Sequence, residues 1–348
     1  MKKVIYIHPY NNYTGSTKVM SDVLKSQYKD LKGITVITDT SQEGFLSDLG
    51  LNLINVPILR YSNRAIPIIS AIVWVVVGFF KTLYYIRKFD KVYINTILPG
   101  FAAVAARLCG KQVIYHVHEI YIKKNPKSWF GEFIFNRVSA HRIFVSNYVK
   151  EQYIPKDNCT EEVIYNKLNQ DFLNKVQVVP VALHKRNHVL MLATLQKGKG
   201  IDVFVEAAKL LPNYVFSLVL SCSIEDIKKQ FNKNLPKNLK IYPKQSDVHP
   251  FYRNADVVVN LSNPIYIIET FGLTIMEGMA YGLPAIVPNV GGPKEVIEDK
   301  MTGYSIDVSK STEVVKYIEL CSEEHEYIRL YNNSLKRAEK FTYTIENE

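Results

Sequence analysis

The chain has 348 residues, which is more than one ordinary core needs and suits two domains. Apolar residues make up 47% and charged residues 22%, a composition typical of globular rather than disordered proteins. The formal net charge of +10 favours anionic partners such as nucleotide phosphates or acidic lipid surfaces, or serves only solubility. Nucleic acid is not expected as a partner, because the sequence has no RGG tract, zinc-finger spacing or basic heptad region.

The cysteines indicate a reducing compartment. Cys109, Cys159, Cys222 and Cys321 are widely spaced and form no CxxC pair, so neither a disulfide framework nor a metal cluster is expected. The first residues, from Met1 to Ile7, run directly into a strand pattern without the pattern of a signal peptide. The expected location is therefore the cytoplasm.

The first half of the chain alternates strand and helix patterns. A strand, a loop containing Gly15 and a helix from about residue 17 resemble the start of a Rossmann-like unit, although an ordinary βα turn would look the same. A strand over 112–117 ends at His118, where active-site groups collect in parallel sheets. With an ordinary pKa of about 6.5, His118 could act as a base or donate a hydrogen bond to a substrate. A structural role for this histidine stays an alternative.

Residues 65–80 form the most hydrophobic stretch and carry no charge. Four cations follow closely: Lys81, Arg87, Lys88 and Lys91. A membrane-spanning helix needs about 20 apolar residues, so a span is the least favoured of three interpretations. The others are a core helix and a helix at a membrane interface whose basic flank faces anionic headgroups. The 65–91 region is therefore a candidate for peripheral contact with an anionic membrane, at the inner face of the cell membrane.

The second half repeats the opening pattern of strand, loop and amphipathic helix. In its first loop, Lys197 and Lys199 alternate with Gly198 and Gly200. Glycines let backbone amides approach an anion while a lysine neutralises its charge, although a solvated basic turn would have the same composition. The expected layout is a first domain over 1–170, a hinge over 171–187, a second domain over 188–325 and a C-terminal helix over 326–348. A crossing of this helix back to the first domain is also an expectation.

The most specific stretch is residues 263–293, where Glu269 and Glu277 flank the sequence FGLT. Buried strand patterns precede and follow it, so the segment reads strand, loop, helix, strand. Gly272 lets the backbone come close to a ligand, and Thr274 can cap a helix whose N-terminus would hold an anion. The pattern predicts a phosphate on backbone amides between two carboxylates that bind hydroxyls, which describes a sugar nucleotide.

The second half resembles the retaining glycosyltransferases of family 4, which have the two-domain GT-B architecture. The matching pieces, in order, are KGIDVFVEAAKLL (199–211), FYRNADVVVNLS (251–262), the E-x7-E pair, MAYGLPAIV (279–287), GGPKEVI (291–297) and TGYSID (302–307). The first half agrees more loosely, through VIYHVHE (113–119), RIFVSNYV (142–149) and VIYN (163–166). The resemblance implies an α/β fold of two Rossmann-like, doubly wound domains that face each other across a cleft.

The resemblance also implies roles by position. Glu269 would contact the hydroxyls of the donor sugar, Glu277 those of the ribose, and Lys199 would neutralise charge on the diphosphate. The amides of Gly272, Leu273 and Thr274 would hold the diphosphate. From the first domain, His118 would face the donor sugar, and Gly15 and Ser16 would lie beside the diphosphate.

Some positions depart from the family. A basic residue is common where this chain has Thr194, so one diphosphate contact is missing or is supplied by Lys197. Gly15-Ser16 replaces the common glycine pair, and Gly278 replaces the usual alanine after the second glutamate. The chain also stops early for the family, which would shorten the C-terminal helix.

The expected activity is transfer of a sugar, with retention, from a nucleotide donor to a lipid-linked or polysaccharide acceptor. A UDP-sugar is the donor expected by analogy. No metal site and no cofactor besides the nucleotide sugar are expected, since no DxD-type cluster is placed to hold Mg²⁺. The alternatives are an epimerase or a glycogen-type phosphorylase of similar fold, and a non-catalytic nucleotide-sugar-binding homologue.

Overall fold

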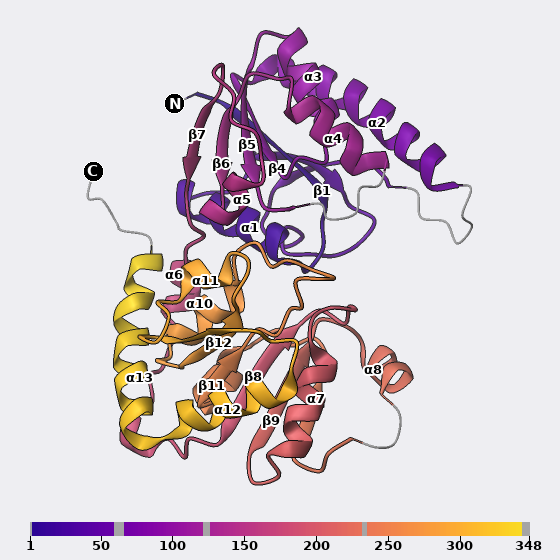
Figure 1. Ribbon diagram of the computed structural model, residues 1–348. Coiled ribbons are helices and arrows are strands. Elements are labelled where there is room, and N and C mark those ends of the chain that lie inside the picture. Colours follow the sequence, from indigo (N-terminus) through magenta and orange to yellow (C-terminus); the bar gives the residue numbers. More distant parts are fainter. Residues whose placement is uncertain (1, 59–65, 121–125, 232–234, 343–348) are drawn as a thin grey trace. The chain divides into compact units, whose positions relative to one another are not determined.

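Runs of valine and isoleucine form the strands of two parallel sheets, and both faces of most of these strands are buried. The computed structural model describes residues 2–58, 66–120, 126–231 and 235–342 (Figure 1). The chain divides into unit 1, Met1–Tyr165, and unit 2, Asn166–Glu348. Each unit has its own sheet, and the two sheets share one topology.

Unit 1 contains a seven-stranded sheet in its described part, with the order β3-β2-β1-β4-β5-β6-β7 and every neighbouring pair parallel. The strands are β1 Val4–Tyr10, β2 Thr35–Asp39, β3 Asn52–Asn55, β4 Lys91–Asn95, β5 Gln112–Val117, β6 His141–Phe144 and β7 Thr160–Val163. The helices are α1 Gly15–Gln27, α2 Ile66–Tyr85, η1 Ile86–Lys88, α3 Gly100–Leu108, α4 Pro126–Phe135 and α5 Asn147–Glu151. The VIYN segment at 163–166 begins at the last residue of β7 and continues past this strand.

Unit 2 contains a six-stranded parallel sheet in its described part, with the order β10-β9-β8-β11-β12-β13. The strands are β8 His188–Ala193, β9 Val215–Leu220, β10 Leu239–Tyr242, β11 Val257–Val259, β12 Ala285–Pro288 and β13 Gly303–Ile306. The helices are α6 Gln170–Leu173, η2 Val181–Leu183, α7 Ile201–Leu210, α8 Ile224–Gln230, α9 His249–Asn254, α10 Leu273–Met279, α11 Pro293–Val296, α12 Ser311–Ser322, α13 Glu324–Ala338 and η3 Glu339–Phe341.

In both sheets the strand order reverses at one point, between β1 and β4 in unit 1 and between β8 and β11 in unit 2. Doubly wound sheets bind ligands outside the carboxyl ends of the strands at this reversal. The two doubly wound domains expected from the sequence are therefore confirmed. The cleft expected between them stays a prediction.

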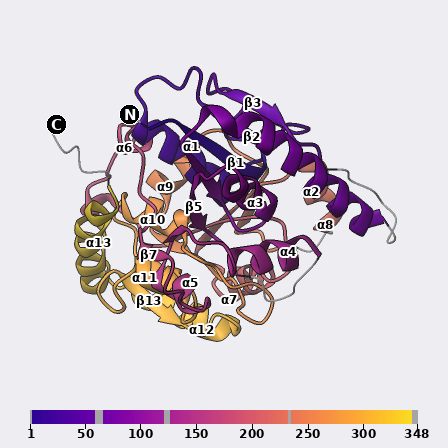
Figure 2. The same cartoon turned by 90° about the horizontal axis from the view of Figure 1, so that it is seen from above.

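Helix α2 contains most of the charge-free stretch and continues past it to Tyr85. One side of this helix is core: Trp74 is buried and meets Phe101 of α3 edge-on, with 4.9 Å between ring centroids. Gly78 lies so close to the Phe101 ring that a Cβ there would come within 2.5 Å of it. Figures 1 and 2 show α2 lying alongside α3. Residues 69–88 meet the length and composition that a membrane-crossing helix needs, but a core helix meets them too.

The C-terminal part of unit 2 holds two helices, α12 and α13, and the C-terminal helix expected from residue 326 begins at Glu324, as α13. Glu323 is extended, with ψ 133°, and separates α12 from α13. The Tyr331 hydroxyl on α13 donates to the carbonyl of Val179 at 2.5 Å, and the amide of Leu168 donates to the carbonyl of Phe341 at 2.7 Å. The end of the described chain is therefore packed on the beginning of unit 2. The expected crossing to the first domain stays a prediction, and residues 343–348 lie outside the described part.

Candidate active site

Three loops of unit 2 meet at the carboxyl ends of β8, β11 and β12, which are neighbours in the sheet. They are residues 194–200, 260–272 and 289–292. Because parallel strands end at one edge, residues that are seventy positions apart in the sequence come together there. This edge contains most of the predicted donor-binding residues.

Lys199 and Glu269 form an ion pair between the first and second of these loops. Their side chains are only 16% and 23% exposed. The hydroxyl of Ser262, at the start of the second loop, lies 3.3 Å from the same carboxylate oxygen of Glu269. The structure thus brings together the predicted sugar-binding carboxylate and the predicted diphosphate-binding lysine in a partly shielded position.

The backbone at Glu269 is held by the glycine pair of the third loop. The amide of Gly292 donates to the carbonyl of Glu269 at 2.9 Å. A Cβ at Gly291 would lie 2.5 Å from that carbonyl oxygen, and one at Gly292 would lie 2.0 Å from the carbonyl oxygen of Thr270. Gly291 also has φ +100°, which favours glycine. Gly291 and Gly292 are therefore required for the close packing that holds the loop of Glu269.

The loop that carries Lys199 also packs on the loop that carries Glu269 through close backbone contacts at its glycines. The carbonyl of Gly198 accepts from the amide of Asn263 at 2.7 Å, and a Cβ at Gly200 would lie 2.0 Å from the carbonyl oxygen of Leu261. Lys197 lies on the exposed outer part of this loop, with its Nζ 4.8 Å from the centroid of the Tyr266 ring. Its predicted contact with the diphosphate stays a prediction.

Glu277 lies on α10 and is buried. It accepts a hydrogen bond of 2.7 Å from the hydroxyl of Tyr252 on α9. Burial, together with the neighbouring Glu277 carboxylate, raises the pKa of Tyr252, so this hydroxyl keeps its proton and acts as a donor. Tyr252 was not predicted, since an aromatic residue in an amphipathic segment usually packs in a core. The ribose contact of Glu277 stays a prediction.

Gly272 begins the turn into α10 with φ +108°. It occupies the position before the helix, so the expectation that Thr274 caps this helix is wrong. Leu273 and Thr274 are the first two residues of α10, and the first amides of a helix have no intrahelical acceptor. Gly278 on the same helix packs on β11, where a Cβ would lie 2.7 Å from Val258. This contact leaves no room for a side chain at Gly278, where the family resemblance leads us to expect alanine.

In unit 1, the predicted residues gather at the carboxyl ends of β1, β4 and β5. Gly15 and Ser16 are the first residues of α1, and the carbonyl of Ser16 accepts from the side chain of Asn95 at 3.0 Å. His118 follows β5, and its Nε2 lies 2.8 Å from Oδ1 of the same asparagine. His8 on β1 contacts Asn95 from the other side, with its Nδ1 3.0 Å from Nδ2. His8 and Asn95 were not predicted, although each lies at or near a strand end, as His118 does.

The histidines of this cluster are neutral near pH 7. Burial, and to a lesser extent the neighbouring His116 and His8, holds the pKa of His118 well below its ordinary value. Burial also lowers the pKa of His8 to about 4 and that of His116 to about 3. His118 is therefore a weak base, and its chemistry is that of a neutral hydrogen-bonding group.

No group of three or more histidine, cysteine, aspartate and glutamate side chains that could hold a metal ion occurs in the described part of the chain. The pattern of the site is instead that of a nucleotide site, with a lysine, a carboxylate and a helix N-terminus at a sheet reversal.

Two doubly wound domains with these features define an α/β protein of the GT-B fold. Residues 176–341 match the sequence model of the family described as glycosyl transferases group 1. This match confirms the resemblance to glycosyltransferases that the sequence motifs of the second half indicate.

Three similar proteins span most of the chain. A protein in the cps region of Klebsiella pneumoniae, described as uncharacterized, is 25% identical over 74% of this chain and 75% of its own length. An uncharacterized glycosyltransferase of Methanocaldococcus jannaschii is 24% identical over 98% of this chain and 94% of its own. The crystal structure of Anabaena HepE in complex with UDP and glucose has a TM-score of 0.78 at 18% identity, and the match covers 98% of this chain and 96% of that one. The structural likeness supports the fold.

Proposed function

We propose that the protein is a retaining, metal-independent glycosyltransferase that transfers a hexosyl group from a UDP-sugar to a lipid-linked or polysaccharide acceptor in cell-surface glycan synthesis. The observation that carries the proposal is the Lys199–Glu269 pair, held by two glycine-rich loops at the reversal of the unit 2 sheet. UDP and glucose in the similar Anabaena structure favour a uridine donor. The cps region named for the Klebsiella relative favours a surface polysaccharide.

In this mechanism the leaving UDP gains negative charge as its bond to the sugar breaks. Lys199 and the first amides of α10 stabilise that charge, and they need no reorganisation because the loops already hold them. Glu269 orients the sugar through its hydroxyls, with one of its oxygens in contact with Lys199 and Ser262. Its assignment as an orienting group rather than a nucleophile rests on the family resemblance. Retention follows from the family resemblance.

The test is a screen of nucleotide sugars by thermal shift, followed by transfer to membrane extract and mass spectrometry of the product. A UDP-sugar should stabilise the protein and give a glycosylated product whose anomeric configuration, read by NMR, matches that of the donor. Activity should survive EDTA. Glu269→Gln should abolish product, whereas Glu206→Gln, on the exposed face of α7, should not. Binding without product would indicate a nucleotide-sugar-binding homologue, and a free epimerised donor would indicate an epimerase.

We propose further that the protein works in the cytoplasm, bound peripherally to an anionic membrane through α2. Five apolar side chains repeat at helical spacing along its outer side and are strongly exposed: Ile69, Ile72, Val76, Phe80 and Tyr84. Arg87 and Lys88 follow, also exposed, at the end where the stripe stops. An apolar stripe beside cations is the pattern of a helix that lies in an anionic lipid interface.

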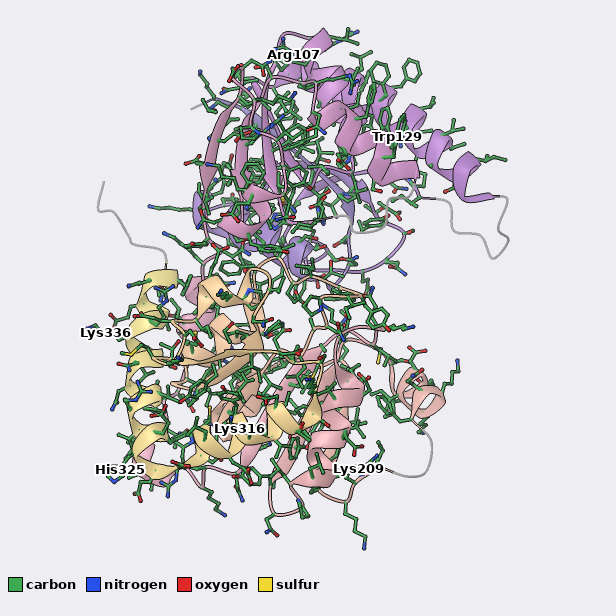
Figure 3. All side chains as sticks on the ribbon, in the orientation of Figure 1. Arg107, Trp129, Lys209, Lys316, His325 and Lys336 are labelled. Carbon is green, nitrogen blue, oxygen red and sulfur yellow. The ribbon has the colours of Figure 1, made fainter. Side chains whose placement is uncertain are left out.

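The neighbouring helix α4 enlarges this apolar surface. Trp129 is 59% exposed and stacks on Phe133, with 5.5 Å between ring centroids. Helix α4 contacts α2, and Figure 3 labels Trp129 on α4. Tryptophan is enriched at membrane interfaces, because its ring is apolar while its N–H can hydrogen-bond to water.

Sedimentation with lipid vesicles tests the membrane contact. The protein should bind vesicles containing phosphatidylglycerol more tightly than vesicles of phosphatidylcholine alone, and Phe80→Glu should weaken both. Ile154→Glu is the matched control, because Ile154 is similarly exposed but lies outside α2 and α4. Equal binding by Phe80→Glu and the wild type would refute the contact through α2.

A further inference from the structure

Asn95 is fully buried at the carboxyl end of β4, where the strand order of unit 1 reverses. Its side chain contacts Ser16 of α1, His8 of β1 and His118 after β5. A buried amide with partners on three elements costs free energy unless each partner is complementary in donors and acceptors. That requirement allows the proton positions to be assigned from the heavy atoms.

The carbonyl of Ser16 determines the orientation of the amide. A backbone carbonyl only accepts, and it lies 3.0 Å from Nδ2 of Asn95, so this atom is the NH₂ group. Oδ1 therefore faces His118, with 2.8 Å to its Nε2. Since an amide oxygen only accepts, Nε2 of His118 must carry a proton. In a neutral imidazole the other nitrogen, Nδ1, then has a free lone pair.

The rest of the cluster holds Asn95 in place. Thr17 Oγ1 donates to Asn12 Oδ1 at 2.7 Å, and His8 Nε2 lies 3.0 Å from the same threonine oxygen. His8 Nδ1 lies 3.0 Å from Nδ2 of the Asn95 side chain and 3.1 Å from the backbone carbonyl oxygen of Asn95. Either tautomer of His8 leaves the assignment at His118 unchanged, because the Ser16 carbonyl alone determines the orientation of the amide.

We propose that Asn95 is a positioning residue, which holds His118 in the Nε2–H tautomer so that Nδ1 accepts a hydrogen bond from a hydroxyl of the donor sugar. The inference rests on the proposed function. From the sequence, His118 was expected to act as a base or to donate a hydrogen bond, and this proposal makes it a hydrogen-bond acceptor instead. Within the described residues, Nδ1 of His118 has no hydrogen-bond partner. This atom is also not fully buried. A neutral histidine in this tautomer distinguishes a hydroxyl, which can donate, from a carbonyl, which cannot.

NMR of the full-length protein labelled with ¹⁵N-histidine tests the tautomer directly. Long-range ¹H–¹⁵N spectra should show His118, assigned by comparison with His118→Gln, as the neutral Nε2–H form from pH 5 to 8. Asn95→Ala should give a mixture of tautomers, whereas Asn55→Ala, at the exposed end of β3, should leave the spectrum unchanged. A neutral Nδ1–H form or an imidazolium in the wild type overturns the inference.

Calorimetry with UDP-glucose and UDP tests the positioning role. Asn95→Ala should weaken UDP-glucose about tenfold and leave UDP unchanged, since one hydrogen bond to the sugar is lost. In Asn95→Asp, which is nearly isosteric, the introduced carboxylate should raise the pKa of His118 and protonate Nδ1. UDP-glucose binding by that variant should then be weak at pH 6 and recover as the pH rises, which a purely structural role would not produce.

Two results would overturn the positioning role: an unchanged ratio of UDP-glucose to UDP affinity in folded Asn95→Ala, or no pH dependence in Asn95→Asp. Should Asn95→Ala fail to fold, the wild-type spectrum and the Asn95→Asp titration still decide the matter. A wild type that binds neither UDP nor UDP-glucose overturns the proposed function and the sugar contact. The tautomer is decided separately by NMR.

Discussion

Replacing Lys199 with methionine should weaken UDP binding and lower the free energy of unfolding. The size of both effects depends on how far the ion pair with Glu269 is shielded from solvent. An unscreened pair about 4 Å apart is worth about 4 kcal/mol at an effective dielectric constant of about 20. Fully exposed pairs contribute about 0.2–1 kcal/mol. Because the Lys199 and Glu269 side chains are 16% and 23% exposed, we expect a coupling energy of about 1–2 kcal/mol between them.

The loss in ligand affinity should be larger than the loss in stability. A hydrogen bond to a charged group contributes about 1.5–3 kcal/mol, so the dissociation constant for UDP should rise about 10- to 150-fold in Lys199→Met. Urea unfolding of the wild type, Lys199→Met, Glu269→Gln and the double variant gives the coupling, and calorimetry gives the affinity. Lys209→Met is the control, because its pair with Glu206 is about half exposed on both sides. An unchanged UDP affinity in Lys199→Met would refute the phosphate assignment.

Three other substitutions test the supports of the two sites. Gly292→Ala should destabilise the protein by about 2 kcal/mol or more and lower the rate of sugar transfer, because the added Cβ would lie 2.0 Å from a carbonyl oxygen. The control is Gly33→Ala, where φ is +84° and no atom lies within 4 Å of the added Cβ. It should cost only about 1 kcal/mol and leave transfer intact. Tyr252→Phe should cost about 1–3 kcal/mol in urea unfolding, since it removes a donor to a buried carboxylate. No loss would contradict a stabilising role of this hydrogen bond. Burial lowers the pKa of His8 to about 4, so the unfolded chain takes up a proton below about pH 6.5 while the folded chain does not. His8 should therefore contribute a fall of on the order of 2 kcal/mol in the free energy of unfolding between pH 7 and pH 5, in addition to the falls from the buried His116 and His118, and urea unfolding of His8→Gln should show a shallower dependence on pH than the wild type.

The architecture was predictable because most strands are buried apolar runs bounded by turn residues. Parallel strands place their carboxyl ends at one edge, so the sequence also indicated where Lys199 and Glu269 would lie. Short edge strands such as β3, with both ends exposed, gave no such signal. The break at Glu323 between α12 and α13 gives no signal in the sequence, because a single extended residue leaves the helical spacing on either side intact.

The polar supports of the sites were not predictable. Tyr252 and Asn95 act through partners that the chain brings together only on folding, 25 residues away in one case and 23 in the other. Neither residue type is unusual in an amphipathic segment or at a strand end. Their partners, Glu277 and His118, carried the sequence signal because the family resemblance pointed to them by position.

The hydrogen bonds between the beginning and the end of unit 2 determine which fragment of the chain can fold as this domain alone. Leu168 and Phe341 are joined through the backbone, and Val179 and Tyr331 through a side chain. A fragment over 188–325 would retain the whole sheet but lose α13 and both of these bonds. A fragment over 166–342 would keep them, so its ends would emerge side by side. Such a domain is suited to insertion into a loop of another protein or to joining its ends in a circular permutant.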